Sequence, residues 1–180
     1  MKNYLVIFGL IISSFSYAQK GSMEVGADIN FWASSNGGSF NIAPRFGYEV
    51  ADNFVIGPSF RFINHWSNMY GIKGKVNITG VGAYGHYRFL EWLYAGLDVE
   101  MYFAPYNYKV GATKYRSVAP AVILSAGLSR KIGDHFRINA GLNYDIVNSV
   151  NSPMQSSYIA RTAKGVRIPM FYRVTFLYVF

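Results

Sequence analysis

The amino-acid sequence predicts an all-β protein, an eight-stranded antiparallel up-and-down transmembrane β-barrel, and three observations lead to that prediction. Eight segments alternate apolar and polar residues, which indicates strands with two unlike faces. Tight connections alternate with longer ones, as they do in barrels that cross a bilayer. Aromatic residues make up 18% of the chain and charged residues only 14%, whereas roughly a quarter of an ordinary soluble domain is charged. This balance favours an exterior that faces lipid.

We expect residues 1–18 to be a secretory signal peptide. Lys2 supplies the positive start, an apolar run occupies residues 4–12, and Ser16-Tyr17-Ala18 forms a small-x-small cleavage site. The apolar run is too short to cross a bilayer as a helix. Residues 19–180 are then expected to form one barrel domain, which has no cysteine and therefore no disulfide to stabilise it after export.

Each of the eight segments has one apolar row, expected to face outward, and one mixed row, expected to face the lumen. The outward rows of the first four segments lie in residues 25–31, 42–50, 54–62 and 81–89. Those of the last four lie in residues 93–103, 122–128, 136–146 and 168–180. Residues 76–79, just before the fourth row, have the opposite parity. That change predicts a bulge or a portion of the strand beyond the membrane.

The connections distinguish the two ends of the predicted barrel. Those near residues 51–53, 90–92 and 132–135 are tight, and those near 34–39, 64–75, 105–117 and 148–166 are longer. Closing eight strands removes free edges, and so narrow an interior is filled by side chains. The last segment alone would also suit a soluble β-sandwich, but seven matching segments favour the barrel. Beyond the first twenty residues no run of about 18 apolar residues occurs, which excludes a helical membrane protein.

Residues 44–57 (PRFGYEVADNFVIG), residues 82–89 (GAYGHYRF) and the terminal Phe180 resemble the small OmpA/OmpX-like outer-membrane β-barrel proteins. The resemblance covers essentially the whole predicted domain and implies location in the bacterial outer membrane. It also implies that the barrel-assembly machinery recognises the last strand, where Arg173, Tyr178 and Phe180 fit the pattern and Thr175 stands in place of the usual Gly. This class shares a fold and little function.

The charges sort by position. Six of the nine acids lie on inward rows and the other three lie in the tight turns, while five arginines also lie on inward rows. Buried charges are tolerated when they are paired and hydrogen-bonded, so we expect a salt-bridged plug in the lumen, with a narrow pore for small solutes as the alternative. The predicted lumen charge network is Glu24, Asp28, Arg45, Glu49, Arg61, Arg88, Asp98, Glu100, Arg137, Asp145 and Arg173.

Cations are concentrated in the longer connections, which carry no acid. We expect these loops to be extracellular and to contact the phosphates of lipopolysaccharide, although a solvated surface without a specific ligand is the simpler interpretation. The basic residues are Lys73, Lys75, Lys109, Lys114, Arg116, Arg161, Lys164 and Arg167. Nucleic-acid binding is not expected, because no binding module is recognisable.

One short motif raises the question of catalysis. His65-Trp66-Ser67-Asn68 resembles the His-x-Ser-Asn signature of outer-membrane lipid A deacylases, which are also eight-stranded barrels. The resemblance implies His65 as base, Ser67 as nucleophile and Asn68 as support for an oxyanion. The acid that orients the histidine in that family has no counterpart in residues 74–89. The alternative is a polar histidine beside an interfacial aromatic belt that includes Trp66.

No metal site or cofactor is expected, because the chain has no cysteine and its three histidines are scattered. We therefore expect an outer-membrane barrel with both termini at the periplasmic side and a structural or surface-binding role. Lipid A ester hydrolysis and solute conduction are the alternatives, and the sequence does not indicate an oligomeric state.

Overall fold

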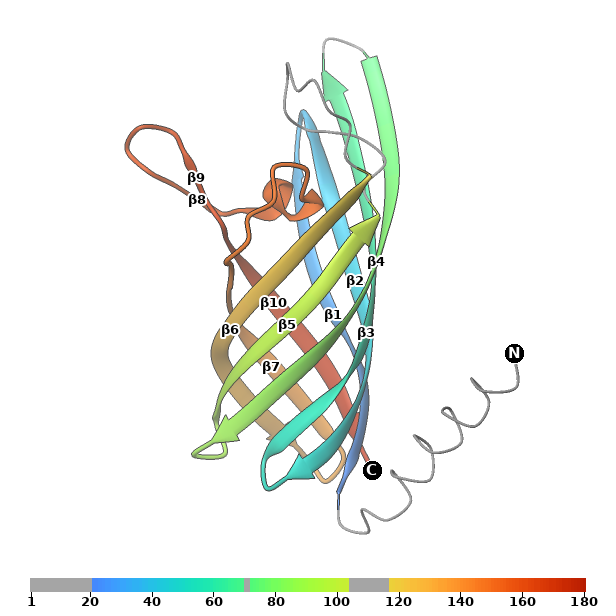
Figure 1. Cartoon of the computed structure of the whole chain (residues 1–180), viewed down its shortest axis with the longest axis vertical. Coiled ribbons are helices and arrows are strands. Elements are labelled where there is room, and N and C mark those ends of the chain that lie inside the picture. The colour runs from blue at the N-terminus through green and yellow to red at the C-terminus, as the bar shows by residue number, and fades with distance from the viewer. Residues whose placement is uncertain (1–20, 70–71, 104–116) are drawn as a thin grey trace, which may run out of the picture.

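The computed structural model describes residues 21–69, 72–103 and 117–180. Its main strands are β1 (Met23–Ser34), β2 (Gly37–Ala51), β3 (Phe54–Met69), β4 (Ile72–Phe89), β5 (Leu93–Phe103), β6 (Val118–Ile132), β7 (Phe136–Asp145) and β10 (Met170–Val179). They form a closed antiparallel barrel in the order β1-β10-β7-β6-β5-β4-β3-β2 (Figure 1). The predicted eight-stranded barrel is therefore confirmed.

The barrel has two unlike ends, which we call the turn end and the loop end (Figure 1). At the turn end, tight connections at residues 52–53, 90–92 and 133–135 join the strands, as predicted. The start of β1 and the C-terminus lie at this end. The loop end carries a short 3-10 helix, η1 (Pro153–Ser157), and a small hairpin of β8 (Ala160–Arg161) and β9 (Arg167–Ile168). No helix within the described residues is long and apolar enough to cross a membrane.

Two of the connections predicted to be long are mostly strand. The β1–β2 ladder continues to the pair Ser34 and Gly37, which leaves a turn at residues 35–36. The β3–β4 ladder continues without interruption to Met69 and Ile72. The polar residues in these stretches led to the prediction of loops. Polar side chains do not prevent the backbone of a hairpin from forming its hydrogen bonds, and the two ladders continue here. We call residues 64–69 of β3 and 72–77 of β4 the loop-end extension.

The parity change at residues 76–79 is not a bulge. The β3–β4 register runs without a shift, and Ile78 is buried on the inward face of β4. The interior of the barrel is apolar around Val76 and Ile78. In the sequence, the apolar residues of this inward row therefore looked like an outward row. The register irregularity of the barrel lies instead between Glu49 and Ala51, where β2 meets the turn to β3.

The exterior is an apolar belt to which every strand contributes. One large apolar side chain from each strand illustrates it, with exposed fractions between 42% and 53%: Val25, Phe46, Phe60, Val81, Val99, Leu124, Leu142 and Phe176. Soluble monomers rarely expose apolar patches of more than a few hundred Å². A belt around the whole barrel therefore needs an apolar surrounding.

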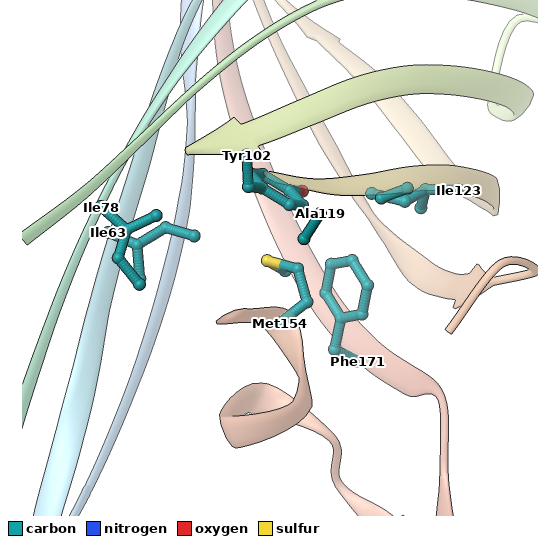
Figure 2. Packing of buried hydrophobic residues seen from close by; sticks show 8 residues of the cluster. Ile63, Ile78, Tyr102, Ala119, Ile123, Met154 and Phe171 are labelled. Atoms are coloured by element: carbon teal, nitrogen blue, oxygen red, sulfur yellow. The ribbon is translucent and has the colours of Figure 1, made fainter. Parts of the chain in front are cut away.

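An apolar cluster lies in the interior at the loop end (Figure 2). Its buried members are Ile63, Ile78, Tyr102, Ala119, Ala121, Ile123, Met154 and Phe171. Met154 is carried by η1 and is fully buried in this cluster, so the helix packs over the barrel opening. The amide of Asn41 on β2 also contacts the Met154 sulfur, at 3.5 Å. A segment distant in sequence from β2 thus packs against the barrel interior at the loop end.

Candidate functional site

The middle of the lumen holds a cluster of buried charges centred on Asp28 of β1. Its Oδ2 lies 2.5 Å from Nη2 of Arg45 on β2 and 3.2 Å from Nη1 of Arg173 on β10. Nη2 of Arg61 on β3 lies 3.6 Å away, and the Thr175 hydroxyl donates to the other carboxylate oxygen at 2.7 Å. One carboxylate thus connects three strands in addition to its own.

Two further carboxylates complete the cluster from β5. Asp98 accepts hydrogen bonds from Arg45, at 2.9 and 3.3 Å, and is also paired with Arg173. Glu100 forms a two-pronged pair with Arg61, from Nε and Nη2, each at 2.7 Å. This fork geometry is the strongest arrangement available to an arginine and a carboxylate. We call Asp28, Arg45, Arg61, Asp98, Glu100 and Arg173 the central ion cluster.

The central ion cluster is electrically balanced, with three guanidinium groups and three carboxylates. A fourth pair, Arg88 with Glu24, lies nearer the turn end. None of these eight side chains is more than 7% exposed. Because charges so far from water are stable only when matched and hydrogen-bonded, the balance is what permits this interior. Asn41, Ser125 and Tyr102 add neutral hydrogen bonds to the cluster, while the Nε atoms of Arg45 and Arg173 are buried without a hydrogen-bond partner among the described residues.

Three members of the predicted lumen network do not join these ion pairs. Glu49 accepts hydrogen bonds from the Ser22 hydroxyl and the Asn53 backbone at the turn end. Asp145, at the loop end of β7, accepts from two backbone amides and from the Tyr158 hydroxyl. Arg137 donates to Ser129. All three lie near the ends of their strands, where backbone and hydroxyl groups are their hydrogen-bond partners.

Tyr158 covers Asp145 from the connection after η1. Burial, together with the nearby Asp145 carboxylate, raises the pKa of the Tyr158 phenol. The phenol is therefore protonated at neutral pH, and its hydroxyl donates to Asp145 Oδ2 at 3.1 Å. This contact helps to hold the covering segment on the barrel.

His86 is a buried side chain of the interior that the predicted lumen charge network does not include. Its Nε2 lies 3.1 Å from Nη1 of Arg45, and its ring packs against Tyr84 and Tyr94 with centroids 4.9 and 5.4 Å away. The Arg45 guanidinium also lies 4.5 Å from the centre of the Tyr84 ring, which is cation–π distance. His86 thus fills part of the lumen between Arg45 and two tyrosines.

The basic residues predicted for extracellular loops are found in two places. Lys73 and Lys75 are exposed on the β4 part of the loop-end extension, in a strand where a loop was predicted. Lys164 and Arg167 are exposed at the β8–β9 hairpin, and Arg161 belongs to β8. Lys109, Lys114 and Arg116 lie outside the described residues.

The motif residues His65, Ser67 and Asn68 lie on β3 in the loop-end extension. Strand alternation places His65 and Ser67 on the inward face and Asn68 on the outward face. A cavity of about 520 Å³ adjoins this inward face, lined among others by Trp32, His65, Ser67, Val76 and Ser156. The motif thus lies beside a cavity that the sequence analysis did not predict.

The contacts of His65 join it to η1 and not to Ser67. Its Nε2 lies 3.1 Å from the carbonyl oxygen of Pro153, and the Ser156 hydroxyl lies 3.4 Å from each ring nitrogen. Burial lowers the pKa of His65, and the Pro153 carbonyl offsets part of that effect. Within the described residues no hydrogen bond joins His65 to Ser67, and no carboxylate lines the cavity. Among the described residues, His65 is therefore hydrogen-bonded to η1 and not to Ser67.

The described residues contain no group of three or more His, Asp or Glu side chains that could hold a metal ion. A scan against protein-family models gives no match, and a search of curated proteins finds none that is similar in sequence. Among solved structures, the chain is similar to the outer membrane protein Ail of Yersinia pestis in a phospholipid bilayer nanodisc. The identity is 16%, the alignment covers 89% of this chain and 98% of that one, and the TM-score is 0.44. The barrel assignment rests on the strand pairing described above.

Substituting Asn for Asp28 tests the charge balance of the central ion cluster. Asp28→Asn leaves three buried guanidinium groups with two carboxylates, and breaking a buried pair in this way costs about 3–5 kcal/mol. We expect urea unfolding of the barrel in detergent micelles to occur at clearly lower urea. Asp134→Asn, in the exposed turn at residues 133–135, is the matched control and should unfold as the wild type does. Equal midpoints for Asp28→Asn and wild type would contradict the account.

The contact between His65 and η1 should weaken in acid. Because the folded-state pKa of His65 is lowered, the open state binds a proton more readily than the closed state. Closure is therefore complete above the ordinary histidine pKa of about 6.5 and declines as pH falls below it. Hydrogen-exchange protection factors of residues 153–157 should be lower at pH 5 than at pH 8, and His65→Asn should remove the difference. Equal protection at both pH values in the wild type would rule this out.

Proposed function

We propose that the protein is a bacterial outer-membrane β-barrel with a closed lumen and a structural or surface-binding role. The observation that carries the proposal is the apolar belt on the exterior of all eight strands, combined with a balanced ion cluster in the interior. An apolar outside and a charged inside reverse the pattern of a soluble protein and suit a barrel in lipid. The dense ion pairing supports a plug over the alternative of a narrow pore.

The proposed orientation places the turn end in the periplasm and the loop end outside the cell. Transmembrane barrels have short periplasmic turns and longer extracellular connections, and the two ends of this barrel differ in that way. Residues 1–18, the predicted signal peptide, lie outside the described residues. Export to the periplasm would begin with that segment and end with recognition of β10 by the barrel-assembly machinery. Tyr178 and Phe180 near its end pack edge to face, with ring centroids 4.9 Å apart.

Contact with lipopolysaccharide is supported by the outward row of β4. Above the exposed Val81, this row continues through Thr79 and Asn77 to Lys75 and Lys73. Apolar side chains thus give way to polar ones and then to two exposed cations along one strand face. Such an order matches the passage from hydrocarbon to the phosphorylated sugars of the outer leaflet, which attract cations near the surface. Because both lysines lie on one face of a strand, their positions relative to the leaflet are fixed more firmly than they would be in a loop.

Location and barrel closure can be tested together. Expressed with its complete sequence, the protein should fractionate with outer membranes, and its unboiled form should migrate differently from its boiled form on a denaturing gel. The reason is that a closed barrel resists detergent until heat opens it. Recovery in the soluble fraction, or identical mobility before and after boiling, would contradict the proposal.

The lysine pair on β4 can be tested separately. Binding of the refolded protein to immobilised lipopolysaccharide should weaken in Lys73→Gln/Lys75→Gln, by roughly 1 kcal/mol per lysine or roughly 30-fold for both. Lys73→Arg/Lys75→Arg retains both charges and should bind as the wild type does. The difference between the two variants should shrink at high salt, since the attraction is screened. Wild-type affinity in the glutamine variant would refute the contact.

A further inference from the structure

A second hollow lies at the turn end, far from the His65 cavity. It consists of a cavity of about 590 Å³ and a smaller one of about 270 Å³, which share Asn53, Arg88, Lys131 and Arg137 in their walls. We call the space around these four residues the turn-end vestibule. None of the functions proposed above uses it.

Two cations face each other across the wall of the turn-end vestibule. Lys131 on β6 is the direct cross-strand partner of Arg137 on β7. The pair next to them, Ser129 and Asn139, is buried and joined by a hydrogen bond of 2.7 Å, which shows that this row faces inward. Like charges directly opposite one another in an antiparallel pair are destabilising. The sequence could have relieved the repulsion with an acid at either position.

The nearby carboxylates form no ion pair with Arg137 or Lys131 among the described residues. Arg137 donates to the Ser129 hydroxyl at 2.8 Å but has no ion pair with any residue that the structure describes. The two acids in the walls are Glu49, whose oxygens accept from Ser22 and Asn53, and Glu91, which is exposed in the tight turn at residues 90–92. Neither acid forms an ion pair with Arg137, so N–H groups of the Arg137 guanidinium remain available to a ligand.

Arg88 adds a third cation to the wall. One of its terminal nitrogens is paired with Glu24, while its Nε is buried without a hydrogen-bond partner among the described residues. The side chain is more than nine-tenths buried. The vestibule therefore combines an arginine without an ion pair among the described residues, a facing lysine and the buried Arg88 around one open space.

We propose that the turn-end vestibule binds a phosphate group, with Arg137 and Lys131 as its principal ligands. A phosphate offers several acceptor oxygens and a full negative charge, and the arginine fork matches its geometry. The group could belong to a phospholipid headgroup of the adjoining leaflet or to a small soluble phosphate. Exposed Leu90 and Trp92 beside the larger cavity suit the boundary between lipid and water. The site does not depend on the role proposed for the loop end.

Trp92 provides a local probe of the site. The chain has three tryptophans, and the other two, Trp32 and Trp66, lie at the loop end. In a Trp32→Phe/Trp66→Phe background, refolded in an uncharged detergent free of phosphate, Trp92 fluorescence should change saturably during titration. One arm uses sodium phosphate at constant ionic strength, and the other uses short-chain phosphatidylglycerol. A response to sodium phosphate identifies a small-anion site, and a response to the lipid alone identifies a headgroup site.

Variants decide whether Arg137 and Lys131 are the ligands. Lys131→Gln/Arg137→Gln should bind at least about tenfold more weakly, and Lys164→Gln, at the loop end, should bind as the parent does. A second measurement separates binding from folding. Without phosphate, Arg137→Gln should unfold at higher urea than wild type because it removes the facing like charges, and phosphate should stabilise the wild type alone. No response to either probe, or equal affinity in the double variant, would overturn the proposal.

Discussion

The pairing of Asp28 with arginines from three other strands is the interaction on which the rest of this structure depends. Eight strands enclose a space that side chains must fill, and here the filling is charged. Removing charges from water is costly, and only matched partners offset that cost. Because Arg45, Arg61 and Arg173 come from β2, β3 and β10, the same contacts that neutralise the interior also join the walls. The outward rows around the middle of the barrel are apolar.

The interior changes in character from one end to the other. The loop end is apolar and covered by η1, with Met154 inserted and His65 and Tyr158 fastening the cover. The middle is balanced in charge, and the turn end carries an excess of cations around the vestibule. In the function proposed here the first two layers close the lumen, which would leave the surfaces at the two rims for interactions.

Much of the fold was visible in the sequence because lipid on one side and packed charge on the other impose a strict alternation. All eight strands and the three tight turns follow from it. The ends of the strands did not, because beyond the lipid both faces meet water and the alternation fades, as it does in residues 64–69. The partner of each inward arginine also depends on barrel stagger, which a single strand does not encode. His65 meets η1 across 88 residues of chain, and no local pattern announces such a contact.

The most direct test of the central claim is electrical. Purified, refolded wild-type protein inserted into a planar lipid bilayer should give no discrete current steps, because the central ion cluster and the apolar cover leave the lumen without a continuous wet path. Insertion itself can be verified by recovery of the protein with the lipid. Reproducible single-channel steps from inserted wild-type protein would contradict the account, since they would require an open path through the cluster.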